Sequence, residues 1–506
     1  MFVDYTWQDW IALGESDEKK TDMLKKIVAA YKSSADFKQA LTASQYFAGD
    51  NPEIKNKVYL TTGMVETTDE RTGRKRKTRR RVELKGVQMP NSVFYTFVVQ
   101  ENQHLLGNGV SFSIEEGEPD PKDALGRNFD TNLSRMGENA LQHGVCYAFW
   151  NLDHVEIIKA AADKASGCVA IVDEKTSAIM MAVQFWQIAD RKPMYIRTFE
   201  PDGITIYRLD VKKDAELVVD TPKTHYIRTV YSDAAGEEIM SEEDYGVLPV
   251  IPLYANEERR SELTEAIRAK IDAYDRILSD FGDNLQRAND VYWVLNNFGG
   301  TTDDMLQMIA DIQALRMVAS MSDGMGGQST AEPHTIEVPY QARQTALDVL
   351  KRAMYRDAMA LDMDQLTGGS LTNVAIQAAT ANLNLKCDRY EWQVIDFMEK
   401  LLALIGMPEA ADHMTLTRRT LTNATETVNA IAMMREDIDI RTALKLNPLI
   451  NPDDIDGIVA AVEAEKQARA SSFDEIDRLL RDHGSGSNPD KGSEQDEGTV
   501  TDGGEE

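Results

Sequence analysis

Two aspartates beside a pair of glycines are the residues of this sequence most suggestive of chemistry. Asp362 and Asp364 precede Gly368 and Gly369, and two carboxylates in one loop are a minimal site for a hard divalent cation. An enzyme using such a metal would lose its activity when either aspartate became asparagine. The alternative is that a helix ends here and that these side chains cap the next helix. We favour capping, and we therefore expect neither a metal nor a cofactor.

A basic run from Arg71 to Arg81 is the strongest charge anomaly, because eight of its eleven residues are Lys or Arg. Such a run predicts contact with nucleic acid or with an acidic partner. It has no aromatic residue on which a base could stack, so we favour a solvated arm that pairs with Glu66 and Glu70 or with an adjacent subunit. Its candidate residues are Arg74, Lys75, Arg76, Lys77, Arg79, Arg80 and Arg81.

The other reactive side chains match no catalytic motif. The seven histidines show neither an HExxH motif nor paired Cys/His spacing. The sequence has no GxxxxGK[ST] phosphate-binding loop, no GxSxG nucleophile motif and no GxGxxG motif after a strand. An ATPase or hydrolase would need such parts, so we expect a protein that is not an enzyme.

Length, charge and cysteine content narrow the class further. The 506 residues are material for about three domains, and the formal net charge is −29. This charge disfavours nucleic-acid binding over the whole surface but allows contact at a local basic patch. Three dispersed cysteines argue against a disulfide framework and predict a reducing, cytosolic setting. We expect no membrane helix and no secretory signal, because neither pattern is present.

Periodicity divides the first half of the chain into helical and sheet-rich parts. Residues 1–50 and 90–111 carry apolar side chains at helical spacing. Residues 57–84 predict two strands around a turn at 69–73, and most of the basic run lies on the second strand. Short apolar runs between 145 and 250 predict an antiparallel sheet, since no long crossover helix separates them.

Long amphipathic helices are expected in the second half. One is predicted over 256–286, roughly 46 Å long, a second over 341–361 and a third over 373–405. Strand patterns at 291–295 and 335–338 lie in the insert between the first two helices. The predicted fold class is therefore α+β and predominantly helical. Helices near 50 Å exceed what a compact domain needs, which predicts an elongated protomer that packs sideways against its own copies.

Several short motifs resemble, in their order and spacing, the portal proteins of long-tailed double-stranded-DNA bacteriophages, which form the ring at the unique capsid vertex. The most specific stretch is GVLPVIPLYAN from Gly246 to Asn256, followed by IDAYD from Ile271 to Asp275. Further matches are Tyr46–Gly49, Asn91–Asn108, Gly144–Tyr147, Leu278–Asp280, Ser370–Ala375 and Asn382–Leu385. Together they run from about residue 40 to residue 406.

The resemblance implies an elongated portal protomer with wing, stem, clip and crown regions that assembles into a cyclic ring of twelve subunits. The implied regions are a wing at 1–255, a first stem helix at 256–287, a clip at 288–340, a second stem helix at 341–361, a tunnel loop at 362–372, a long wing helix at 373–406, a crown-like helical region at 407–482 and a disordered acidic tail at 483–506. The apolar stripe of the first stem helix would then be buried between neighbouring subunits; its residues are Ile267, Ile271, Tyr274 and Ile277.

Partners and DNA-facing residues are also implied by the resemblance. The partners are double-stranded DNA, terminase, the major capsid and scaffolding proteins and the head–tail adaptor, in the virion and, during assembly, in the host cytoplasm. In the tunnel loop the candidates are Asp362, Asp364, Gln365, Thr367, Gly368, Gly369 and Ser370; in the stem they are Gln344, Asp348 and Lys351; in the clip they are Asp303, Asp304 and Met325. The alternative is a monomeric or dimeric DNA-binding factor acting through Arg71–Arg81, with strongly salt-dependent affinity.

Overall fold

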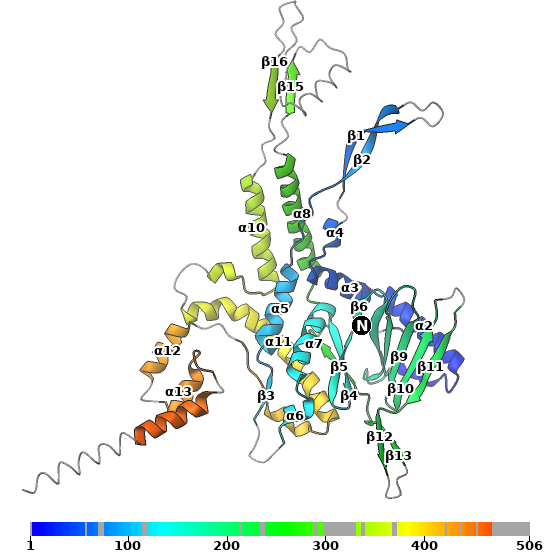
Figure 1. The fold of residues 1–506 in the computed structure, drawn as a ribbon, viewed down its shortest axis with the longest axis vertical. Helices are drawn as coiled ribbons and strands as arrows, with labels where there is room; N and C mark the ends of the chain where they lie inside the picture. Colours follow the sequence, from blue (N-terminus) through cyan, green and yellow to red (C-terminus); the bar gives the residue numbers. More distant parts are fainter. Residues whose placement is uncertain are drawn as a thin grey trace, which may run out of the picture. The chain divides into compact units, whose positions relative to one another are not determined.

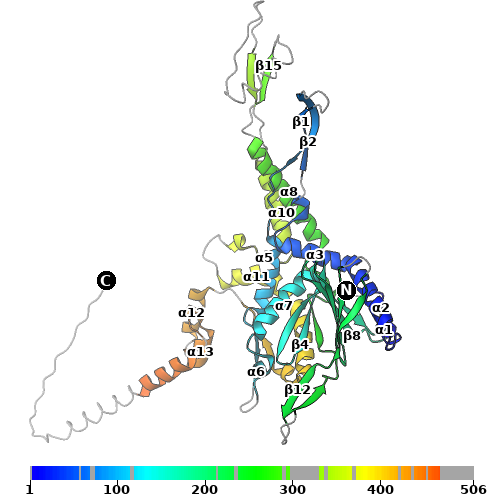
Figure 2. The ribbon, with the colours of Figure 1, turned by 45° about the vertical axis from the view of Figure 1, so that its right-hand side comes forward.

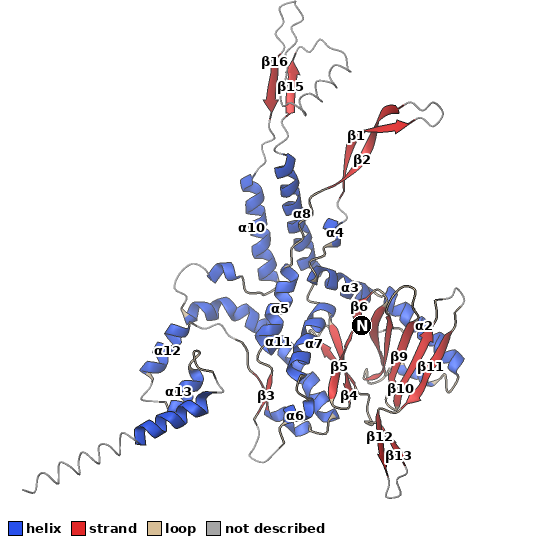
Figure 3. Ribbon diagram, in the orientation of Figure 1, coloured by secondary structure: helices blue, strands red, loops and turns tan. Residues whose placement is uncertain are grey.

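Helices and antiparallel strands are both prominent in the computed structural model (Figure 1, Figure 3), which confirms the α+β prediction. The described residues are 3–55, 58–68, 75–113, 119–211, 215–232, 238–287, 292–296, 330–334, 340–366, 372–419, 423–434, 438–451 and 454–467. They form two compact units. The first contains residues 1–368 and 378–420, and the second contains residues 369–377 and 421–506.

A six-stranded antiparallel meander is the largest sheet of the first unit. Its strands are β6 (Ala161–Asp163), β7 (Ser166–Val172), β8 (Ile179–Gln187), β9 (Met194–Glu200), β10 (Gly203–Leu209) and β11 (Leu217–Thr224). The first three helices of the chain are α1 (Trp7–Ile11), α2 (Asp17–Ser33) and α3 (Ala35–Phe47). Leu24, Ile27 and Tyr31 of α2 are buried against this sheet, as their spacing predicts.

A second sheet has the strand order β14–β4–β5 and packs against one long helix. Its strands are β4 (Val145–Asn151), β5 (His154–Lys159) and β14 (Val250–Tyr254), and the helix is α7 (Phe129–His143). Gly144 follows α7 with a φ of 89°, a left-handed conformation that lets the chain pass directly into β4. Pro252, in the LPVIP part of the sequence motif, lies on the edge strand β14, where no ladder donor is lost.

The remaining elements of the first unit connect or cover these sheets. The helices are α4 (Pro52–Lys55), α5 (Val93–Leu106), α6 (Pro121–Leu125), most of α11 (Asn373–Leu404) and the short 3₁₀ helices η1 (Met363–Leu366) and η2 (Pro408–His413). The paired strands are β1 (Val58–Thr68) with β2 (Lys75–Lys85), β3 (Val110–Phe112) with β17 (Met414–Leu416), and β12 (Ile227–Ser232) with β13 (Glu238–Glu243). Residues 414–416 lie within the region 407–482 that was expected to be helical, and for them this expectation was wrong, because they form β17 and pair with β3.

Two long helices, α8 (Glu265–Arg287) and α10 (Tyr340–Asp357), flank the insert, which we define as residues 288–339. Both are shorter than predicted. Thr264 caps α8 by accepting a hydrogen bond from the backbone N–H of Ile267 at 3.3 Å, so the helix begins at residue 265 rather than 256. The second helix ends before residue 361 because Met359 has a φ of 52°.

The insert contains one described strand pair, β15 (Tyr292–Asn296) with β16 (Thr330–His334). The first predicted strand, at 291–295, is confirmed apart from its first residue, which lies outside the described residues. The predicted strand at 335–338 also lies outside them, whereas β16 precedes it in the chain.

The second unit is helical where it is described. It contains α12 (Ala424–Met433), α13 (Ile440–Leu446) and helical residues 455–467, together with the first turn of α11. Asn423 caps α12, and Asp439 caps α13. The backbone N–H of Asn373 donates to Glu426 at 2.7 Å, and its side-chain oxygen accepts from the backbone N–H of Asn423 at 2.7 Å. These contacts hold the start of α11 against α12.

Candidate functional site

The helix pair α8–α10 is the centre of the candidate site, because it carries the insert at one end and the loop after residue 357 at the other. The two helices lie side by side and run antiparallel (Figure 2). At the insert end, the rings of Phe281 and Tyr340 are 5.7 Å apart between centroids. At the loop end, the Lys270 ammonium lies 2.6 Å from the Asp357 carboxylate. Each end of the pair is therefore closed by a contact between the helices.

The apolar face of α8 is partly buried within the protomer itself. Ile267 and Ile271 are only 4% and 1% exposed in the isolated protomer. They are therefore buried inside the protomer, and the expectation that they are buried between neighbouring subunits was wrong for these two residues. Tyr274 and Ile277 are partly exposed and stay available for such a contact.

Three polar side chains continue the buried face of α8 at every fourth residue, and we call Asp275, Ser279 and Asp283 the polar ladder. The exposed fractions of the first two are 0%. The backbone N–H groups of every second residue in the extended segment 87–91 donate to them. The bonds are Asn91 N to Asp275 Oδ1 at 3.1 Å, Met89 N to Ser279 Oγ at 3.1 Å and Val87 N to Asp283 Oδ1 at 2.7 Å.

The ladder works because two repeats match in length. Four residues of an α-helix rise about 6.0 Å, and two residues of extended chain span about 6.6 Å. A polar side chain at every fourth position of α8 can therefore meet every second N–H of segment 87–91. Sequence reasoning missed this set because polar residues on an otherwise apolar face look like an interruption. The signal was present, since Ile267, Ile271 and the ladder share one four-residue spacing.

Asp275 is the most connected residue of the ladder. Its Oδ1 also accepts from Asn91 Nδ2 at 2.5 Å, and its Oδ2 accepts from Asn51 Nδ2 at 2.9 Å. Asn51 Nδ2 also donates to Asp272 Oδ1 at 3.0 Å. Burial raises the pKa of Asp275 to about 6, although the amide donors of Asn51 and Asn91 oppose the rise.

We expect Asp275→Asn to flatten the dependence of stability on pH between about pH 4 and pH 7. The pKa of Asp275 is above its ordinary 3.8 in the folded protein, so the folded state binds the proton more tightly than the unfolded state. This contribution to stability is present below about pH 4 and is lost as the pH rises through about 6, on the order of 3 kcal/mol in all. Thermal unfolding across this pH range measures it. Asp348→Asn, on the exposed side of α10, is the matched control, and parallel curves for Asp275→Asn and wild type would contradict the prediction.

The ladder also holds the base of the basic hairpin. Strands β1 and β2 pair in register from Val58 with Lys85 to Thr68 with Lys75, which confirms the two predicted strands. Segment 87–91 follows β2 directly. Gln88 Nε2 donates to the backbone oxygen of Lys55 at 2.9 Å, so the two ends of the hairpin are joined to each other as well as to α8. Candidates Lys75 to Arg81 lie on β2, and Arg74 lies outside the described residues.

The two aspartates of the predicted tunnel loop lie next to a predicted stem residue. The Lys351 ammonium pairs with Asp364 and lies 3.9 Å from Asp362 Oδ1. Asp362 Oδ1 also accepts from the backbone N–H of Asp364 at 3.2 Å, at the start of η1. Asp362 thus caps η1, whereas Asp364 pairs with Lys351. Among the described residues, no group of three or more His, Cys, Asp or Glu side chains could hold a metal ion.

Only some of the other predicted stem, loop and clip residues lie in the part of the chain that the structure describes. Gln344 and Asp348 are exposed on α10, and Gln365 lies in η1. The remaining candidates lie outside the described residues: Thr367, Gly368, Gly369, Ser370, Asp303, Asp304 and Met325. A cavity of about 510 Å³ beside Asp362 is lined by two arginines of α10, Arg352 and Arg356, and by Asn382 of α11. No motif in the sequence marks these residues, because only the folded chain brings α11 next to α10.

A buried charge cluster joins α5, α11 and the segment before α8. Lys386 Nζ lies 2.7 Å from Glu101 and 3.0 Å from Glu262, and the exposed fractions of Lys386 and Glu101 are 13% and 2% for their side chains. Burial acts to lower the pKa of Lys386, but the two carboxylates outweigh it and the pKa is raised. Lys386 is therefore charged, and its two ion pairs connect α11 to α5 and to the segment before α8.

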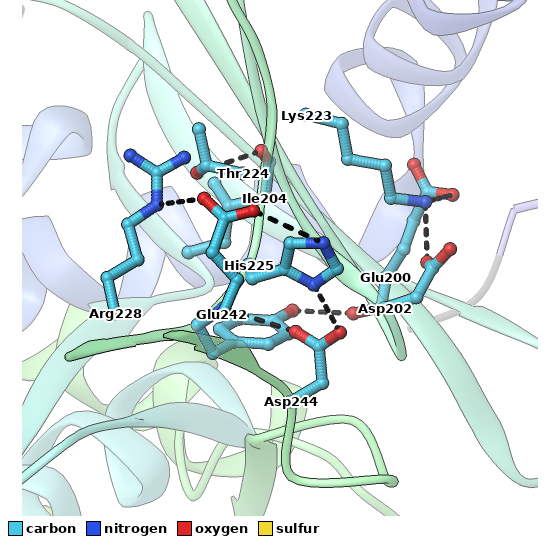
Figure 4. A network of polar contacts seen from close by, with 10 residues as sticks. Glu200, Asp202, Ile204, Lys223, Thr224, His225, Arg228, Glu242 and Asp244 are labelled. Atoms are coloured by element: carbon cyan, nitrogen blue, oxygen red, sulfur yellow. Dashed lines mark hydrogen bonds and ion pairs between the residues drawn. The ribbon is translucent and has the colours of Figure 1, made fainter. Parts of the chain in front are cut away.

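Two described histidines, His143 and His225, lie in structural contacts. His143 is buried, shares a hydrogen bond of 2.8 Å with Ser44, and its Nδ1 has no partner among the described residues. A catalytic Ser–His pair needs a third group on that nitrogen. Figure 4 shows His225 between β11 and β12, where its Nδ1 lies 2.7 Å from Asp244. Neighbouring ion pairs join Lys223 to Asp202 at 2.5 Å and Arg228 to Glu242 at 3.2 Å (Figure 4). This network ties the β12–β13 hairpin to the large sheet.

Among the described helices, none has the length and apolar composition that crossing a membrane requires.

The family described as "Phage portal protein, SPP1 Gp6-like" matches residues 28–480. A portal protein of Clostridium phage phiCD119 is 24% identical over 240 residues, which cover 46% of this chain and 52% of that protein. The chain thus matches about half the length of this relative. The portal protein of Bacillus phage SPP1 is 23% identical over 398 residues, which cover 73% of this chain and 74% of that protein.

Among solved structures, a chain from the neck of a native GTA particle, computed with C12 symmetry, superposes with a TM-score of 0.32 and 10% identity. The superposition covers 73% of this chain and 89% of that chain. The family match, by contrast, extends over the sheet-rich part, the α8–α10 pair, the insert and α11. It confirms the resemblance inferred from the motifs: the chain belongs to the SPP1 Gp6-like family of phage portal proteins.

Proposed function

We propose that twelve copies of this chain form a closed ring that conducts double-stranded DNA through the unique vertex of a phage capsid during packaging, retention and ejection. The observation that carries the proposal is the antiparallel α8–α10 pair, closed at both ends and interrupted by an insert, in a chain whose family match runs from residue 28 to 480. In a cyclic ring, such pairs stand side by side around a channel, and neighbours meet through two different surfaces.

The proposed regions follow the order of elements. Residues 1–255 and 373–406 form the wing, α8 and α10 form the stem, residues 288–340 form the clip, residues 362–372 form the tunnel loop, and residues 407–482 form the crown. On α10, the exposed Gln344 and Asp348 are the residues proposed to face the channel. Lys351 is proposed to position the loop through Asp364 instead of contacting DNA directly.

The charge of the chain suits a conduit. DNA must slide in both directions, and a strongly basic lining would retain it by counterion release. A net charge of −29 per copy makes the ring as a whole acidic. We further propose that the protein has no catalysis of its own, that terminase and then the head–tail adaptor dock on the clip, and that the major capsid and scaffolding proteins contact the ring. Its place is the portal vertex of the virion, reached by assembly in the host cytoplasm.

Native mass spectrometry with negative-stain imaging tests the ring. Twelve copies of a 56.6 kDa chain predict a particle of about 680 kDa with a central hole. Monomers or dimers at micromolar concentration across a range of salt would contradict the proposal. In that case, an affinity for duplex DNA that disappears when Arg79, Arg80 and Arg81 become glutamine would support the alternative, a DNA-binding factor that acts through the basic hairpin.

A further inference from the structure

The described helices of the second unit have almost no core of their own. Helix α12 has ten residues and α13 has seven, and neither contains a buried residue. In the described part of residues 423–467, only Ile455 is buried, with an exposed fraction of 5%. By contrast, α2 of the first unit alone buries five side chains. Helices as short as α12 and α13 are marginal in water without packing, so a single chain does not give this unit the interior that it needs.

Large apolar side chains are nevertheless abundant in the second unit. The most exposed are Val374 at 71%, Met433 at 85%, Met434 at 43%, Leu446 at 51% and Leu449 at 72%. Nine further Val, Ile and Leu side chains of residues 423–467 are only half-buried. A single exposed apolar residue is ordinary on a protein surface. A set of this size in one small unit indicates a surface that another chain segment covers.

Polar contacts hold the described helices of this unit in place. Asn373 at the start of α11 is bonded to Glu426 and to Asn423 at 2.7 Å each. Arg441 of α13 pairs with Asp456 of the helical residues 455–467. These contacts fix the helices and leave the five most exposed apolar side chains uncovered.

Charge excludes the acidic tail as the cover. Residues 421–467 contain nine acidic and four basic residues, a formal charge of −5. Residues 483–506 contain seven acidic residues and one lysine, a formal charge of −6. Two segments of the same sign repel each other, so the tail does not fit this surface.

The segment between the described helices and the tail is too small to cover the surface. Residues 468–482 have a formal charge of −1 and only four large apolar side chains, at 473, 476, 479 and 480. They would have to cover five exposed and nine half-buried side chains on α11, α12, α13 and residues 455–467. In a closed ring each copy has two neighbours, and each neighbour presents the same apolar set at the same height.

We propose that the second unit of each copy completes its apolar core against the second unit of the adjacent copy, with Met433, Leu446 and Leu449 in the contact. This inference rests on the proposed ring and goes beyond it, because it makes the folding of the crown-like region depend on assembly. Since both partners carry a formal charge of −5, screening by salt should strengthen the contact. Residues 468–482 of the same chain are the competing occupant.

Photo-crosslinking from residue 433 tests the contact. Met433 is replaced by p-benzoylphenylalanine, which keeps the position apolar, and full-length chains with two different tags are co-expressed, assembled and irradiated. We expect a product that carries both tags at twice the 56.6 kDa of one chain, joined to residues 421–467 of the second copy. The matched control carries the same photoreactive residue at Ala464, which is exposed on the side of residues 455–467 opposite Ile455 and should give no such product.

Substitutions and salt provide the second readout. Leu446→Asp with Leu449→Asp should lower the yield of the mixed product about tenfold, because charged side chains replace apolar ones in the contact. Thr425→Asp with Asn429→Asp adds the same charge at two exposed polar positions of α12 and should change the yield less than about twofold. Raising the salt to about 0.5 M should preserve or increase the yield, and a loss of product at high salt would overturn the apolar contact.

The attachment site and the native mass separate the remaining outcomes. Attachment only within one chain, to residues 468–482, would overturn the proposal in favour of the chain's own segment. Attachment to a second copy outside residues 421–467 would also overturn it. Rings of about 680 kDa without a mixed product would overturn the shared core and leave the ring intact. Monomers without a mixed product would overturn both.

Discussion

Replacing Lys386 by methionine is expected to lower the free energy of unfolding by about 3–5 kcal/mol. The change removes the cation that lies 2.7 Å from Glu101 and 3.0 Å from Glu262. Glu101 is 1% exposed as a residue, so water cannot replace the lost partner and an uncompensated carboxylate is left in the interior. Thermal and urea unfolding at equal protein concentration measure the loss, since assembly makes stability depend on concentration.

The controls separate burial from charge. Lys400 lies on the same helix, 2.6 Å from Asp396, but the side chains of this pair are 50% and 45% exposed. Lys400→Met should therefore cost less than about 1 kcal/mol. Adding Glu101→Gln to Lys386→Met should recover part of the lost stability, because it removes the unpaired charge. Equal losses for Lys386→Met and Lys400→Met would show that the cluster is not a buried tie.

Replacing Asp275 by alanine is expected to lower the free energy of unfolding by about 2–4 kcal/mol. The substitution leaves two donors of Asn91, its backbone N–H and its side-chain amide, without their acceptor, and it removes one of the two acceptors of the buried Asn51 amide. We also expect faster hydrogen exchange at Val87, Met89 and Asn91, because the segment that joins the hairpin to α8 loses its central attachment.

A neighbouring substitution gives the scale for this effect. Ser279 accepts one bond of the ladder, from the backbone N–H of Met89, so Ser279→Ala should cost about 1 kcal/mol. It should raise exchange mainly at Met89. If Asp275→Ala and Ser279→Ala gave the same exchange pattern over 87–91, the ladder would not act as a set of separate attachments.

Much of the fold could be predicted from local pattern. The face of α2, the two strands around the basic run and the long helix α11 all follow from periodicity that is confirmed by the structure. The motif GVLPVIPLYAN pointed to the family, which the match over 28–480 confirms. These features are local because each depends on the spacing of side chains within one element.

The rest depends on contacts between distant segments. Nothing in residues 256–264 marks them as non-helical until Asn256 accepts from the N–H of Arg260 at 3.0 Å and Thr264 caps α8. The polar ladder of α8 can be recognised only together with segment 87–91, which donates to it and lies almost 200 residues earlier in the chain. Lys386 likewise resembles an ordinary helix lysine until α5 brings Glu101 beside it. Contacts between segments so far apart produce no regular spacing of residues, so a single sequence does not predict them.

The ladder gives α8 and the hairpin a mechanical connection. The three hydrogen bonds are spaced along the helix. A translation or rotation of α8 would therefore displace segment 87–91 and, with it, the hairpin that precedes this segment. An axial shift of one helical turn, about 5.4 Å, would thus be passed to the far end of an arm about 36 Å long. The orientation of the hairpin therefore depends on the position of α8. A molecule that binds the hairpin would, for the same reason, restrain the helix.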